Sequence, residues 1–158
     1  MTSKWKYVAA AACLAASAPV AGGGLPLTDT PAGRIGEVHV AVSHLRSAKG
    51  SVIACLTADP ARFPRCGDDS NARRAQVAAG KADAIVFRGV RPGRYAVALL
   101  HDENGNGKAD RAMSMIPREG FGFSRDAKVK MGPPRFDDAA FAVKDSALRM
   151  TITMRYML

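Results

Sequence analysis

The stretch from residue 101 to 110, HDENGNGKAD, places oxygen-bearing side chains at alternate positions. Calcium takes six to eight hard oxygen ligands, and a loop with ligands at positions 1, 3, 5, 7 and 9 can wrap around one ion. Gly107 stands at position 6, where such loops turn tightly, and Met113 replaces the bidentate glutamate of position 12. We therefore expect calcium affinity of about 10⁻⁴–10⁻³ M. The expected ligands are the side chains of Asp102, Asn104, Asn106 and Asp110 and the backbone carbonyl of Lys108.

The same composition is typical of a turn that needs no metal. Asn and Asp side chains accept hydrogen bonds from backbone N–H groups two residues on, and Gly tolerates positive φ. A turn held by such bonds is thus the alternative to a calcium loop. The sequence leaves both interpretations open, and calcium is the one cofactor that it suggests.

An acid–base set can also be written from this region. His101, Asp102 and Glu119 carry suitable groups, and Ser124 lies nearby in GFGFSRD. However, neighbouring residues of a strand point to opposite faces, so His101 and Asp102 do not automatically form a base and its orienting partner. No G-x-S-x-G nucleophile motif is present. We expect a protein that is not an enzyme, with an envelope enzyme using His101, Asp102 and Glu119 as the alternative.

These residues follow a predicted strand, YAVALLH at 95–101, which is apolar on both faces and is therefore expected to be central and covered. Alternating apolar and polar residues predict further short strands. For the segment 70–80 the pattern does not decide between a short helix and a strand. Together the segments predict an all-β protein built as a single antiparallel β-sandwich of about six to eight strands. The other expected strands are 34–45, 51–57, 83–87, 138–143 and 148–158.

Residues 102–136 form the irregular part of the chain, rich in Gly, Pro, Asn and Asp. We interpret this segment as a packed excursion across one end of the sandwich, where a binding site is expected. The alternative is a long loop held down by its own apolar residues. Those residues are Ile116, Phe121, Phe123, Met131 and Phe136.

The N-terminus has the pattern of a secretory signal peptide. Lys4 and Lys6 precede an apolar run of roughly 15 residues, which small residues follow. That run is shorter than the roughly 20 residues of a membrane span. We expect cleavage near Ala21 and a periplasmic or secreted mature chain without a transmembrane span. The expected division is a signal peptide at 1–21, a flexible linker at 22–33 and the sandwich at 34–158.

The chain has 158 residues, and its 23 Lys and Arg against 14 Asp and Glu give a net charge of +9. This length fits one domain. Only 6% of the residues are aromatic, which leaves little for a base-stacking surface, and export makes nucleic acid an unsuitable partner. The positive charge instead predicts an anionic envelope component, or another envelope protein, as the partner. A solvated basic surface is the alternative.

Removing the signal peptide also removes Cys13 and leaves Cys55 and Cys66, which are 11 positions apart. Two cysteines in an exported chain can pair in an oxidising compartment, so we expect a disulfide. A buried Cys55 with a free Cys66 thiol is the alternative.

Three segments in order, VRPGRYAVALLHDENGNGKAD, IPREGFGFS and GPPRFDDAAFAV, resemble a bacterial exported family known only as domain of unknown function 2141. The resemblance covers roughly residues 35–158. Ala109 stands where the family usually has Leu, and Arg118 where Lys is common. The resemblance implies a prealbumin (transthyretin) or Ig-like sandwich and no assigned activity.

A looser likeness concerns the same region. PG-x-Y followed by a D-x-N-x-N-G loop looks like the repeats of some bacterial surface adhesins, whose loops bind calcium; this is analogy at the level of the fold. From these observations we expect an exported, non-enzymatic β-sandwich that binds or scaffolds a component of the cell envelope, with a weak calcium-stabilised loop at 102–110.

Overall fold

The structure is a computed structural model that describes residues 35–66, 69–109, 111–112 and 116–158. The predicted signal peptide at 1–21 and the predicted linker at 22–33 lie outside these residues, as do Asp110 and Met113. Ten strands are present in the described part, and two of them are only two residues long.

The first sheet has three strands in the order β10 (Ala147–Thr153), β1 (Gly36–Ser43) and β4 (Ile85–Val90). β1 runs antiparallel to β4 and parallel to β10. Val38 lies opposite Phe87 of β4 and Leu148 of β10. Alternate residues of β1 are buried, because successive side chains of a strand point to opposite faces.

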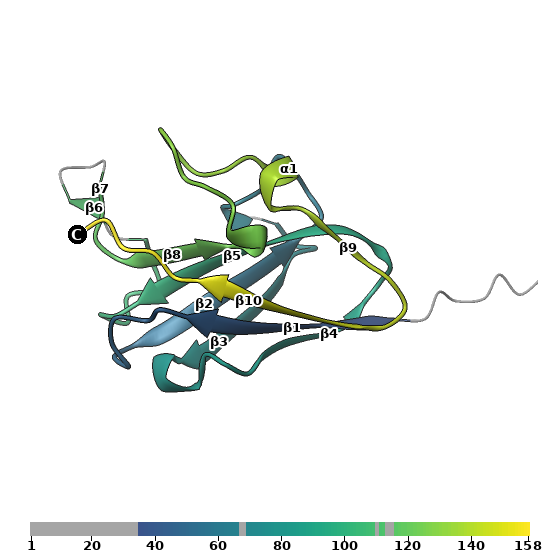
Figure 1. The fold of residues 1–158 in the computed structure, drawn as a ribbon, viewed down its shortest axis with the longest axis horizontal. Coiled ribbons are helices and arrows are strands. Elements are labelled where there is room, and N and C mark those ends of the chain that lie inside the picture. Colours follow the sequence, from purple (N-terminus) through teal and green to yellow (C-terminus); the bar gives the residue numbers. More distant parts are fainter. Residues whose placement is uncertain (1–34, 67–68, 110, 113–115) are drawn as a thin grey trace, which may run out of the picture. The chain divides into compact units, whose positions relative to one another are not determined.

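The second sheet is antiparallel, in the order β3 (Arg73–Ala78), β2 (Ser51–Thr57), β5 (Gly93–Asp102) and β8 (Gly120–Phe123). β9 (Phe141–Val143) pairs with the first residues of β5. Figure 1 shows the two sheets and the short elements around them. These elements are the β6 (Arg111–Ala112) and β7 (Ile116–Pro117) pair, the 3₁₀ turns η2 (Ala79–Lys81) and η3 (Ser124–Asp126), and α1 (Phe136–Ala139).

The main hydrophobic core combines residues of both sheets, as expected for a β-sandwich. Val40 and Ile152 of the first sheet belong to the same buried cluster as Leu56 and Leu99 of the second. The all-β sandwich predicted from the sequence is therefore confirmed. The parallel pairing of β1 with β10 is a feature that the predicted antiparallel arrangement did not include.

A second hydrophobic cluster packs against the other face of β5. Its residues come from the segment between β2 and β3, from β8 and from the segments that follow β8. The ring of Phe63 lies edge-on to those of Phe123 and Phe136, with centroids 5.8 and 6.0 Å apart. Ala96 of β5 belongs to this cluster, while Val97 belongs to the main core. Because apolar residues cover both of its faces, β5 is the central, covered strand that the sequence predicted.

Each predicted strand is present, but two are clearly shorter than expected: β10 ends at Thr153 instead of residue 158, and β9 begins at Phe141 instead of residue 138. The segment 70–80, left open between helix and strand, contains β3, which pairs with β2. Within the segment 102–136, β8 is a regular strand of the second sheet, so this part is less irregular than expected. Phe121, Phe123 and Phe136 do pack in the second cluster, but Met131 is fully exposed. The expectation that Met131 helps to pack the segment is wrong.

A disulfide joins Cys55 of β2 to Cys66, as predicted. Among the described residues, no helix has both the length and the apolar character needed to cross a membrane.

Candidate functional site

Asp102, the last residue of β5, is fully buried and organises the loop that follows. Its Oδ1 accepts hydrogen bonds from the backbone N–H groups of Gly105 (2.8 Å) and Asn106 (3.1 Å). Its Oδ2 accepts one from Gly107 (2.8 Å). One carboxylate therefore accepts hydrogen bonds from three backbone donors of the loop.

The two asparagines of the loop close smaller turns. Asn104 Oδ1 accepts from the N–H of Asn106 (3.0 Å), and Asn106 Oδ1 accepts from the N–H of Lys108 (2.8 Å). Gly105 and Gly107 have φ of 77° and 71°, which glycine adopts at low cost. These are the hydrogen bonds expected for a turn that forms without metal.

The calcium interpretation stays a prediction. A carboxylate or amide oxygen can accept more than one contact, so the turn bonds do not by themselves exclude an ion. Asp110 lies outside the described residues, so the convergence of the five expected ligands is not tested. Within the described part of the chain, no three His, Cys, Asp or Glu side chains are grouped to hold a metal.

His101 lies on the inner face of β5 and is fully buried at one end of the sandwich. Its Nε2 lies 2.9 Å from the carbonyl oxygen of Lys49, and its Nδ1 lies 2.7 Å from the hydroxyl of Tyr156. A carbonyl only accepts, so Nε2 carries the proton. In the neutral imidazole, Nδ1 then accepts from the Tyr156 hydroxyl, which itself accepts from the N–H of Arg46 (3.2 Å).

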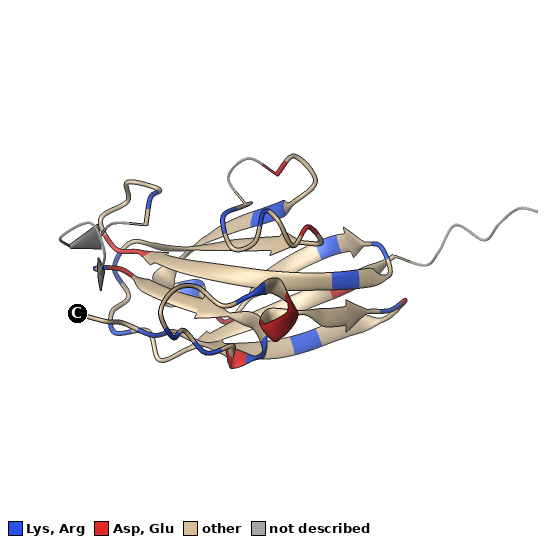
Figure 2. Cartoon of the chain, turned by 90° about the horizontal axis from the view of Figure 1, so that it is seen from above, with Lys and Arg blue, Asp and Glu red and all other residues tan. Residues whose placement is uncertain are grey.

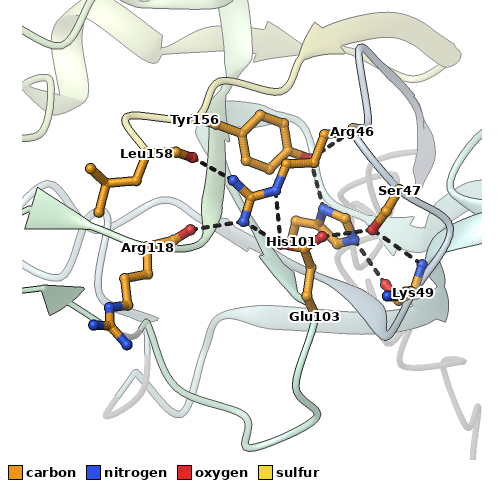
Figure 3. A network of polar contacts seen from close by, with 8 residues as sticks. All are labelled: Arg46, Ser47, Lys49, His101, Glu103, Arg118, Tyr156 and Leu158. Atoms are coloured by element: carbon orange, nitrogen blue, oxygen red, sulfur yellow. Dashed lines mark hydrogen bonds and ion pairs between the residues drawn. The ribbon is translucent and has the colours of Figure 1, made fainter.

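Arg46 connects the β1–β2 loop to three distant segments (Figure 3). Its guanidinium donates to the carboxylate of Glu103 and to the carbonyl oxygens of Arg118 and Leu158. It also lies over the ring of Tyr156, 4.5 Å from the centroid. Arg46 therefore fastens the loop after β5, the segment before β8 and the C-terminus to one another.

Glu103 completes this network. Its Oε1 accepts a hydrogen bond from the Ser47 hydroxyl (2.6 Å), while its Oε2 accepts from Arg46. The hydrogen bonds from Arg46 and then Ser47 lower the pKa of Glu103 to about 2, against the opposing effect of burial. Burial raises the pKa of Tyr156, so its hydroxyl stays protonated and available as the donor to His101.

The residues that could form a catalytic set have structural partners instead. His101 and Asp102 are adjacent but bond to different segments, as expected for neighbours on a strand. Ser124 is fully buried; it accepts from the N–H of Val97 (2.9 Å) and donates to the carbonyl of Ala139 (2.6 Å). Glu119 is also buried.

No sequence motif singles out Arg46, Ser47 or Tyr156. Arg46 is 57 positions from Glu103 and 110 from Tyr156, so no local spacing reveals the network. One signal was present. Apolar and polar residues alternate near the C-terminus, and Tyr156 falls on the same face as Met154. This pattern predicts that the Tyr156 side chain points inward, where its hydroxyl needs a hydrogen-bond partner.

A shallow groove of about 450 Å³ lies elsewhere, on the three-stranded sheet. His39, Val86 and Arg149 are among its lining residues, and it shares no residue with the network around His101. A binding site was expected at the 102–136 end, and this groove does not supply it.

Figure 2 shows Lys and Arg spread over both strands and loops. Several of the arginines are engaged within the protein: Arg94 pairs with Asp137 (2.8 Å), and Arg88 with Glu37 (3.4 Å). The Arg73 guanidinium donates to the carbonyl of Arg88 (3.0 Å). Part of the basic excess thus stabilises the connections between strands.

A family model matches most of the sandwich. It is described as "Uncharacterized protein conserved in bacteria (DUF2141)" and matches residues 40–151, which is more than half of the chain. No curated protein and no solved structure matches the chain. The match confirms the resemblance seen in the sequence motifs.

Proposed function

Since the chain belongs to this family of uncharacterised bacterial proteins, we propose that it is an exported, non-enzymatic β-sandwich that binds or scaffolds another component of the cell envelope. The periplasm, or the space outside the cell, is its proposed location. An anionic envelope component or a second envelope protein is its proposed partner.

A non-enzymatic role is supported by the polar groups at residues 101–103, which already have hydrogen-bond partners within the chain. Both ring nitrogens of His101, both oxygens of Asp102 and both oxygens of Glu103 accept or donate hydrogen bonds within the chain. The rival enzyme, with a site at His101, Asp102 and Glu119, would require His101 to release Tyr156 or Lys49 before it could exchange a proton with a substrate. The motif is better suited to holding one end of the sandwich together.

Two features support export. The N-terminal segment has the basic, apolar and small-residue order of a signal peptide, and Cys55 and Cys66 are joined. Disulfides persist in oxidising compartments and are rare in the bacterial cytoplasm.

Export is tested by expressing the full chain and a variant that lacks residues 2–21 in bacteria, then separating cytoplasm, periplasm and medium. We expect the full chain in the periplasm or medium, shortened near Ala21 by intact mass, with cysteines that resist alkylation. The shortened variant should remain in the cytoplasm with alkylatable thiols. An uncleaved full chain in the cytoplasm would contradict the proposal.

Variants of His101 and Tyr156 test whether His101 has the structural role expected in a scaffold. In a scaffold, His101→Gln should lower the free energy of unfolding, while Tyr156→Phe should lower it through the same interaction. The two effects should then be strongly non-additive in the double variant. Independent, additive effects would argue against the shared structural role.

We propose in addition that the loop at 102–110 takes calcium weakly, in the millimolar to submillimolar range typical of extracellular modules. The support is the alternate spacing of oxygen-bearing side chains along the loop, with Gly107 at the position of the tight turn.

A further inference from the structure

The loop between η3 and α1, residues 127–135, extends away from the strands on the side of α1 (Figure 1). Its tip carries Lys128, Lys130 and Met131, all exposed, and the Met131 side chain is as exposed as in an extended chain (relative exposure 104%). Large apolar side chains at such exposure are few among the described residues. An exposed methionine between cations is therefore a feature to explain.

The base of this loop is fixed. Ala127 is buried in the second hydrophobic cluster, and its carbonyl accepts a hydrogen bond from Arg155 (2.9 Å). Val129 packs against the same cluster, and Pro134 and Phe136 are buried at the other end. The alternation of inward Ala127 and Val129 with outward Lys128 and Lys130 places the two lysines on the solvent side of the loop.

The charge of the tip is positive and uncompensated. Lys128 and Lys130 form no ion pair among the described residues, and residues 127–135 contain no acid. The nearby acids of α1 are occupied. Asp137 pairs with Arg94 (2.8 Å), and Asp138 accepts from the N–H of Arg135 (3.3 Å).

We propose that this tip docks the protein on an anionic lipid bilayer, with Lys128 and Lys130 at the level of the lipid phosphates and Met131 inserted at the boundary of headgroups and acyl chains. The inference deepens the proposed function, because it rests on an envelope location and names a lipid surface as the anionic component. A soluble polyanion would use the lysines but would gain nothing from Met131, whereas a bilayer offers both an anionic surface and an apolar layer.

The test is sedimentation of the purified full-length chain with vesicles of phosphatidylcholine alone or with 30 mol% phosphatidylglycerol, at low and at about 0.5 M salt. We expect binding to the anionic vesicles only, weakened by salt. Each lysine near an anionic surface contributes about fivefold to partitioning, so Lys128→Ala with Lys130→Ala should weaken binding about 25-fold. Met131→Ser should weaken it about tenfold.

Matched variants control for net charge and for loss of an exposed methionine. Lys81→Ala with Lys144→Ala removes the same charge from two exposed sites outside the tip, and Met157→Ser removes an exposed methionine near the C-terminus. Both should keep binding within about threefold of the original chain. Since all variants share the same N-terminus, any remaining signal peptide affects them equally.

Three outcomes would overturn the proposal: equal binding to the zwitterionic vesicles, equal loss in the control lysine variant, or a Met131→Ser variant that binds like the original. In the last case, if Met131→Ser and the original chain also bind soluble polyphosphate equally well, the tip binds polyanions and not a bilayer. Absence of vesicle binding would leave the export experiment unaffected, because that experiment contains no lipid-binding readout.

Discussion

Arg46 shows how a single side chain can stabilise contacts between segments that are far apart in the sequence. Its guanidinium is planar and has five donors, so it can bond a carboxylate and two carbonyls while stacking on Tyr156. A lysine offers a point charge and could not make the same set of contacts. The neighbouring Ser47 adds a hydroxyl donor to Glu103, so two adjacent loop residues fix one carboxylate.

The Glu103 network predicts a specific dependence of stability on pH. The pKa of Glu103 falls from 4.5 to about 2 in the folded protein, so the charged form stabilises the fold above about pH 4.5. This contribution is lost as the pH falls from about 4.5 to about 2. Because Arg46 is 39% exposed, solvent screening limits the effect, and we expect Glu103→Gln to cost about 1–2 kcal/mol at pH 6.

The measurement is the free energy of urea unfolding of the original chain and of Glu103→Gln at several pH values from 2 to 7. The difference between them should shrink below pH 4.5. Asp83→Asn, at an exposed site with no ion pair among the described residues, provides the control. A Glu103→Gln difference that is constant over the whole range would contradict the assigned pKa.

For single residues, the sequence predicted the direction of a side chain on its strand better than its hydrogen-bond partners. It indicated that His101 and Asp102 need not form a base and its orienting partner, because neighbouring strand residues face opposite sides, and the two side chains do bond to different segments. It could not identify Tyr156 or Lys49 as the partners of His101, since these contacts span more than 50 positions. Such contacts depend on strand pairing, which the spacing of residues does not reveal.

The loops between elements are as constrained as the strands. Gly50, in the connection between β1 and β2, has a φ of 67°, and a Cβ there would lie 2.0 Å from the backbone oxygen of Asp102. The two loops at this end of the sandwich therefore meet backbone to backbone. Only glycine permits this approach.

We predict that Gly50→Ala lowers the free energy of unfolding by about 3 kcal/mol or more, because it combines an unfavourable φ with a clash against backbone that cannot move aside. Gly132→Ala is the matched control, since no heavy atom lies within 4 Å of the added Cβ and no positive φ is required. The check is the urea unfolding midpoint of each variant. Equal midpoints would show that the two loops separate easily.

The loop after β5 carries the calcium prediction. If its affinity is about 10⁻⁴–10⁻³ M, then 10 mM calcium stabilises the fold by about 1.4–2.7 kcal/mol, or roughly 4–8 °C in Tm. Asn104→Ala removes an expected ligand from an exposed site and should abolish this shift while the protein still folds. Asp102→Asn should do the same, with an added loss of stability because Asp102 holds three backbone donors.

Calorimetric scans with 10 mM calcium, 10 mM magnesium or chelator provide the measurement. Magnesium should shift Tm much less, since it demands a tighter octahedral site. An unchanged Tm in calcium, or equal shifts in both metals, would leave the loop as a turn held by its own hydrogen bonds.

At the element scale, period-two alternation located the strands but not their order or direction. Residues 51–57 were predicted as a strand, and β2 spans Ser51–Thr57. The alternation that predicted β10 says nothing about its parallel pairing with β1. The expected strand at 138–143 is shorter because α1 takes its first residues; Phe136 and Ala139, three apart, both face the second cluster.

On the scale of the whole molecule, the disulfide joins β2 of the second sheet to the segment that leads into β3. Cys55 belongs to β2, and the loop that the bridge closes contains Phe63, which packs against Phe123 and Phe136. A hydrogen bond connects the same two segments: Asp69 accepts from the buried Thr57 hydroxyl of β2 (2.6 Å). That bond lowers the pKa of Asp69 and keeps its carboxylate charged.

Reduction of Cys55–Cys66 is expected to lower the free energy of unfolding by about 3 kcal/mol, because it frees the unfolded chain from a loop of roughly 12 residues. The native contacts of Phe63 and Thr57 remain possible in the reduced protein, so it should fold but unfold at lower urea. Urea unfolding with and without dithiothreitol measures this difference. The double variant Cys55→Ala with Cys66→Ala should match the reduced protein and show no further response to reductant.

The Phe63→Ala variant separates the contribution of the disulfide to stability from that of the Phe63 ring packing. If the bridge acts on the unfolded chain, oxidised Phe63→Ala should still lose about 3 kcal/mol on reduction, in addition to the packing loss. If reduction costs nothing once Phe63 is removed, the bridge acts only by holding that ring in the second cluster. The first result would also mean that the protein is less stable in a reducing environment than in an oxidising one, whether or not Phe63 is packed.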